Sequence, residues 1–145
     1  MNARFYTTAE VAEVSGITLQ HYKQMVRRGQ MALSAPRVGT GRTQPHTAGD
    51  VLQAAFLAHL ARLGIGPRRA SMIWAMAAVP NLDRDAMILL APRPDDSDLD
   101  VRVMLPGGDD GLDRPDAPAA FAAVNLGLLQ SRIAARLDAM AECAA

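Results

Sequence analysis

The sequence predicts a fold that is mainly α with small β elements, and three observations lead to this prediction. Apolar residues recur at three- and four-residue spacing over much of the chain, behind residues that commonly start helices. A stretch rich in glycine and proline interrupts the helices at residues 31–47. Two short segments, 86–91 and 100–105, resemble strands, the second by its alternating apolar residues. Half of the 145 residues are apolar, so the chain is expected to bury a modest core.

The first helical pair lies at the N-terminus. Thr8 is a plausible N-cap of a short helix that Gly16 stops, and Thr18 starts a second helix that ends at Gly29. Two short helices separated by a Ser-Gly-Ile turn are typical of a helix-turn-helix, because glycine permits the tight reversal. Any small helical hairpin would give the same pattern.

The glycine- and proline-rich stretch favours a short two-stranded wing. Pro36, Gly39, Gly41 and Pro45 exclude a helix there, and residues 38–42 would form the tip of the wing.

Two further helices are expected after the wing. Thr47 or Asp50 starts a helix that Leu63 and Gly64 close, and Pro67 suits the first position of another helix that runs to Val79. The face expected to be buried on the first of these comprises Val51, Ala54, Ala55, Ala58 and Leu60.

In the second half, the two strand segments are expected to form a β-hairpin. A long helix is then expected from Pro118 toward Glu142, with an apolar stripe at near-heptad spacing that packs on its own domain or on a second copy. The stripe consists of Leu126, Leu129, Ile133, Leu137 and Met140, with Phe121 and Val124 adding apolar surface. The residues expected at a dimer contact are Phe121, Leu126, Leu129, Ile133 and Leu137.

The formal net charge of zero hides two halves of opposite sign. Residues 1–70 hold nine basic and three acidic side chains, a net charge of +6, and residues 71–145 carry −6. Because phosphates attract the first half and repel the second, any nucleic acid is expected to dock on the N-terminal half. Two solvated surfaces without a ligand would give the same division.

The sequence shows no set of residues typical of an enzyme, a cofactor-binding protein or a metal-binding protein. No catalytic Ser/His/Asp or Cys/His set and no phosphate-binding loop is apparent, so we expect no enzyme activity and no cofactor. Cys143 is the single cysteine, and Asp96, Asp98 and Asp100 lack the glycine and glutamate of a calcium loop, so no metal site is expected. Neither a membrane helix nor a signal peptide is apparent, which favours a cytoplasmic protein, and binding to nucleic acid would make it nucleoid-associated.

In the order of its motifs, the segment from about residue 5 to 75 resembles the N-terminal domain of the MerR family. The matching features are Phe5 or Tyr6, Gly16-Ile17, Arg42, Thr47 to Asp50, and Leu63-Gly64-Ile65. The chain departs from the family at Gln20 to Lys23, where an arginine and two aromatic residues are usual. It departs again at Arg42 to His46, where an Arg-x-Tyr unit is usual.

The resemblance implies a winged helix-turn-helix DNA-binding domain at residues 1–78. Residues 79–145 would then form a dimerisation or regulatory region, and the resemblance favours a second copy as the partner of the C-terminal stripe.

The expected DNA contacts follow from this arrangement. The second helix would enter the major groove, with Leu19, Tyr22 and Val26 held in the core and other side chains reading base edges. The arginines that end this helix or open the helix at Pro67 would contact phosphates, and those that flank the wing would reach the backbone or a minor groove. The base-reading set is Thr18, Gln20, His21 and Lys23. The phosphate set is Arg27, Arg28, Arg37, Arg42, Arg68 and Arg69.

The sequence thus predicts a sequence-specific transcriptional regulator that binds double-stranded DNA as a homodimer, with RNA polymerase as a further candidate partner. An alternative is a phage-type DNA-packaging small terminase or an excisionase-like accessory protein, which use a similar module. A third possibility is a protein-interaction adaptor that has lost DNA binding.

Overall fold

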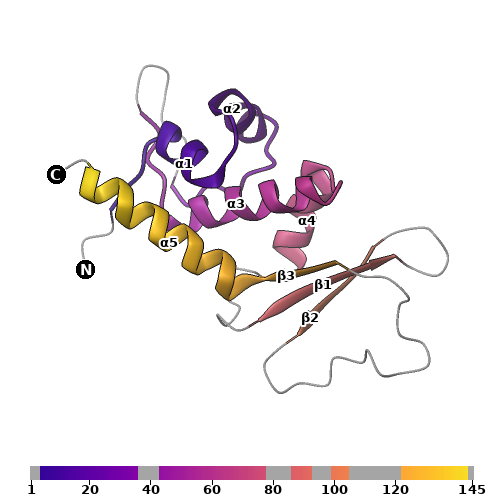
Figure 1. Ribbon diagram of the computed structural model, residues 1–145. Helices are drawn as coiled ribbons and strands as arrows, with labels where there is room; N and C mark the ends of the chain where they lie inside the picture. Colours follow the sequence, from indigo (N-terminus) through magenta and orange to yellow (C-terminus); the bar gives the residue numbers. More distant parts are fainter. Residues whose placement is uncertain (1–3, 36–42, 78–85, 93–98, 105–121, 144–145) are drawn as a thin grey trace.

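The computed structural model describes residues 4–35, 43–77, 86–92, 99–104 and 122–143, and for Pro92, Leu99 and Asp100 the backbone alone. These residues form a mainly helical protein with one small three-stranded antiparallel sheet (Figure 1). The helices are α1 (Thr8–Ser15), α2 (Leu19–Arg27), α3 (Ala48–Arg62), α4 (Pro67–Met76) and α5 (Leu126–Cys143). The strands are β1 (Met87–Pro92), β2 (Leu99–Met104) and β3 (Ala122–Asn125).

Local capping signals fix α1 and α2. The N-cap of α1 is Thr7 rather than the expected Thr8, because Glu10 accepts a bond from the Thr7 backbone N–H at 2.6 Å and completes a capping box. The same bond lowers the pKa of the Glu10 carboxyl. Gly16 ends α1 in the left-handed conformation with φ 70°, which disfavours a larger side chain. Thr18 caps α2 as expected.

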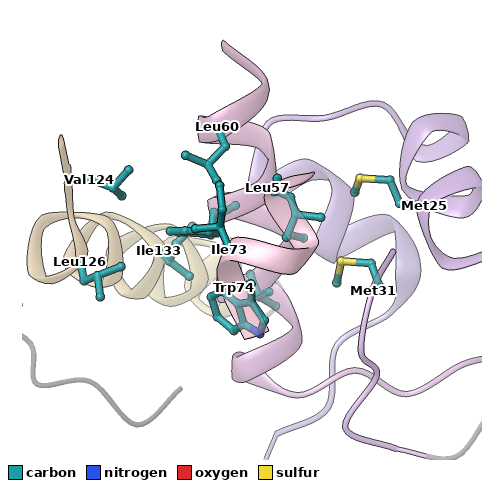
Figure 2. Packing of buried hydrophobic residues seen from close by; sticks show 14 of the residues in the cluster. Met25, Met31, Leu57, Leu60, Ile73, Trp74, Val124, Leu126 and Ile133 are labelled. Atoms are coloured by element: carbon teal, nitrogen blue, oxygen red, sulfur yellow. The ribbon is translucent and has the colours of Figure 1, made fainter. Parts of the chain in front are cut away.

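Helix α3 lies at the centre of the molecule and is buried on most of its surface. The expected apolar face is buried, and so are Phe56 and Leu57. Figure 2 shows Leu57 and Leu60 of α3 beside Ile73 and Trp74 of α4 and Ile133 of α5. A helix that is apolar nearly all round must be covered by several neighbours, and here α1, α4 and α5 pack against it.

The sheet contains the expected hairpin and one further strand. β1 lies in the middle, antiparallel to both β2 and β3, so that Leu89 pairs with Arg102 on one side and with Ala123 on the other. Residues 122–125 were expected to be helical, and this prediction was wrong. Val124 instead pairs with Ile88, and both side chains are buried.

The C-terminal helix therefore begins at Leu126 and not at Pro118. Asn125 helps to start it, because its Oδ1 accepts a hydrogen bond from the Leu128 backbone N–H at 2.9 Å. Pro118 and Phe121 lie outside the described residues.

A single hydrophobic core joins the two halves of the chain. Ile88, Val124 and Leu126 belong to the same apolar cluster as Val11 and Phe56, so the expected boundary at residue 78 does not separate two cores. Helix α5 runs alongside α1 and α3 (Figure 1).

The apolar stripe of α5 is largely covered by its own chain. Leu126, Ile133 and Leu137 are buried in the core, and Leu129 is half-buried against it. The residues of this stripe were expected to contact a second copy of the chain. For Leu126, Ile133 and Leu137 this expectation is corrected, because their apolar surface is already removed from water.

Candidate nucleic-acid interface

The outer face of α2 is polar and exposed. Gln20, His21 and Lys23, three of the expected base-reading residues, are all exposed on this helix. Thr18 is exposed as well, but its hydroxyl is engaged as the helix cap, accepting from the His21 backbone N–H at 3.1 Å. Three of the four residues are thus presented to solvent with side chains that the cap does not use.

The sequence analysis missed one residue of this face. Gln24 is exposed and lies one turn after Gln20, and Arg27 follows three residues later on the same side. The opposite side holds Tyr22, which is fully buried, whereas Leu19, expected in the core, is 39% exposed. Extending the helical pattern by one residue past Lys23 would have found Gln24.

Arginines from two helices meet at one hollow. Arg28 follows the last turn of α2, Arg68 and Arg69 lie in the first turn of α4, and all three line a hollow of about 670 Å³. Pro67 occupies the first position of α4, so the N-terminal end of this helix lies at the same place. The structure brings together three of the six expected phosphate contacts.

The wing itself remains outside the described part of the chain. Arg37 and Arg42 belong to residues 36–42, which the structure does not describe. The flanking residues 31–35 and 43–47 contain no strand and make a single antiparallel bridge, between Tyr6 and His46.

A buried carboxylate ties the two flanks of this segment together. Oδ1 of Asp50 accepts hydrogen bonds from the backbone N–H and the hydroxyl of Ser34, both at 2.9 Å. Oδ2 of Asp50 accepts from the backbone N–H of Thr47 at 2.7 Å. Asp50 is only 1% exposed, so these bonds are shielded from water. The chain before residue 36 and the chain after residue 42 are held by one side chain.

His46 extends this network to α1 and α2. Its Nδ1 lies 3.1 Å from the Tyr22 hydroxyl, and its Nε2 lies 3.3 Å from the Thr8 hydroxyl. A hydroxyl can donate or accept, so a neutral imidazole is satisfied at both nitrogens. We call Thr8, Tyr22, Ser34, His46, Thr47 and Asp50 the polar joint.

Burial shifts the titration of two members of the polar joint. It lowers the pKa of His46, and the Asp50 carboxylate, 4.0 Å away, opposes this shift without cancelling it. Burial also raises the pKa of Tyr22. Both side chains are therefore uncharged at neutral pH. The sequence analysis identified Thr47 and Asp50 only as a helix start and did not connect them with His46.

The described residues offer no other obvious chemistry. No three His, Cys, Asp or Glu side chains within the described ranges lie close enough to hold a metal ion. In the same part of the chain, none of the helices combines the length and the apolar character needed to cross a membrane.

Two comparisons with known proteins, one with protein families and one with curated proteins, give no relative. No protein-family model matches the chain. A search of curated proteins also finds no match. The likeness to MerR proteins therefore rests on the motifs quoted from the sequence.

We expect Asp50→Asn to lower the free energy of unfolding by about 2 to 4 kcal/mol, because an amide nitrogen would face backbone N–H donors and buried charge-assisted bonds would be lost. Urea denaturation monitored by fluorescence of Trp74 measures the change. Asp138→Asn, an exposed site on α5, removes the same charge and serves as the control. A loss that is equal in the two variants would contradict the role given to Asp50.

We expect the protein to lose stability as the pH falls below about 6.5, in part through His46. Its pKa is lowered in the folded state, so the unfolded chain binds more protons in this range, and acid favours unfolding. The urea midpoint of His46→Gln should fall less between neutral and mildly acidic pH than that of the unmodified protein. His21→Gln, which removes an exposed imidazole from α2, is the matched control. If the urea midpoint changes equally with pH in the His46→Gln variant and in the unmodified protein, the role given to His46 is refuted.

Proposed function

We propose that this protein is a sequence-specific transcriptional regulator that binds double-stranded DNA as a homodimer through a winged helix-turn-helix. The observation that carries the proposal is the meeting of Arg28, Arg68 and Arg69 at one hollow, beside the exposed polar face of α2. Residues 1–70, with a net charge of +6, supply the attraction for phosphates.

In the proposed complex, α2 lies in the major groove. Glutamine amides pair with adenine edges and lysine with guanine, so Gln20, Gln24 and Lys23 are the residues we assign to base reading, with His21 beside them. Arg27 and Arg28 at the end of α2 then reach the backbone. Arg68 and Arg69, at the N-terminal end of α4, form a second phosphate contact.

The polar joint would set the geometry of this complex. Tyr22 lies on the buried side of α2 and contacts His46, and Asp50 holds the flanks of the segment that would carry the wing. A recognition helix and a wing can contact the same duplex only if their relative position is fixed. The polar joint supports the proposal because it connects α2 with the chain on both sides of residues 36–42.

We expect Arg28→Gln and Arg68→Gln each to weaken binding to random-sequence duplex DNA by about threefold to tenfold at low salt. Each should also reduce the dependence of log affinity on log salt by about one. Fluorescence anisotropy between about 50 and about 200 mM salt measures both quantities. Arg132→Gln, which removes an exposed arginine from α5, is the control. Equal losses in all three variants would mean that no localised DNA face exists.

The homodimer needs apolar surface that one chain leaves uncovered. On α5 that surface is at Leu128, which is 50% exposed, next to the half-buried Leu129. Light scattering should give about twice the 15.5 kDa of one chain, and Leu128→Asp should shift the mass to a single chain.

Leu63→Asp is the matched control for this experiment, because Leu63 is 46% exposed at the end of α3 and is not assigned to the interface. A single-chain mass for the unmodified protein would contradict the dimer, and a large ring would favour a DNA-packaging protein. A genome-wide binding map tests the regulatory role, since bound sites should lie upstream of genes.

A further inference from the structure

The hollow beside the arginines has an apolar floor that phosphate binding does not require. Met72 and Met76 lie one turn apart on α4 and are 54% and 71% exposed. Val101 contributes from β2, so the wall opposite α4 belongs to the C-terminal sheet. The hollow therefore lies between the basic N-terminal half and the acidic half.

The two methionines give one face of α4 an exposed apolar patch beside the arginines. Methionine is flexible and polarizable, and it is common at binding surfaces that adapt to apolar groups of varied shape. The volume of about 670 Å³ falls in the range typical of small-molecule sites. These properties fit a small organic ligand better than a phosphate alone.

The charges around the hollow define the ligand further. Arg28, Arg68 and Arg69 line it, and the described residues that line it include no acidic side chain. Guanidinium groups bind carboxylate, sulfonate and phosphate groups through paired N–H donors. A ligand with one such group and an apolar body would match the chemistry of both the arginines and the methionines.

We propose that this hollow is a binding site for a small organic anion with an apolar, preferably aromatic, body. Its anionic group contacts Arg28, Arg68 and Arg69, and its body lies over Met72, Met76 and Val101. If the proposed DNA-binding function holds, the ligand competes with DNA phosphates for the same arginines and so releases DNA. The binding itself does not depend on that function.

The test uses the full chain and two fluorescent probes that differ in one group. Anilinonaphthalene sulfonate has an aromatic body and one negative charge, and N-phenylnaphthylamine is its neutral counterpart. We expect saturable binding of the sulfonate, and Arg68→Gln should weaken it by about threefold to tenfold while leaving the neutral probe unchanged. Met76→Gln should weaken both probes, because it removes part of the apolar floor.

Arg132→Gln and Leu63→Gln are the matched controls, since they remove a charge and an apolar side chain away from the hollow, and neither should change the affinity for either probe. A urea midpoint for each variant excludes loss of folding as the cause. Sulfonate binding that is unchanged in both Arg68→Gln and Met76→Gln, or weakened equally by the controls, would overturn the proposal.

A titration with DNA separates this inference from the proposed function. If the sulfonate binds as described and displaces duplex DNA, both are supported. If the sulfonate binds at the hollow but the protein retains no DNA at low salt, the proposed function fails and the ligand site stands. If DNA binds and saturating sulfonate leaves its affinity unchanged, the competition between ligand and DNA is refuted.

Discussion

The carboxylate of Asp50 accepts hydrogen bonds from Ser34 and from Thr47, and it does so from a position almost fully closed to water. A buried carboxylate is costly unless its oxygens accept hydrogen bonds. The chain before residue 36 and the chain after residue 42 donate these bonds, so both must lie against Asp50. His46 follows from the same constraint, because the residue before Thr47 is thereby placed against Tyr22 and Thr8. The orientation of α2, with its polar face outward, depends on these contacts.

The acidic half completes the fold of the basic half. Helix α5 and strands β1 and β3 contribute apolar residues to the core around α3, and Arg136 on α5 donates a hydrogen bond to the Val14 carbonyl at the end of α1, at 2.7 Å. A unit of about 75 residues buries a smaller share of its surface than the whole chain does.

The features that sequence could predict are local ones. The capping residues Thr18 and Thr47 and the proline that opens α4 act within a few residues, and the helices they start were found nearly where expected. Strand β3 was missed because its pairing with β1 spans more than thirty residues of sequence and Val124 also fits a helical stripe. Three other features likewise depend on tertiary contacts that no local pattern specifies. They are the burial of Ile133 against its own chain, the network around His46 and the contribution of Val101 to the arginine-lined hollow.

The proposal that DNA binds at α2 and at the start of α4 is tested most directly by amide hydrogen exchange with and without random-sequence duplex DNA. The measurement reports which segments of the chain become protected when DNA is added. We expect added protection of backbone amides in α2 and in the first turn of α4 at low salt, with little change in β1 and β3. Protection confined to the acidic half, or no change anywhere at DNA concentrations that saturate comparable proteins, would contradict it.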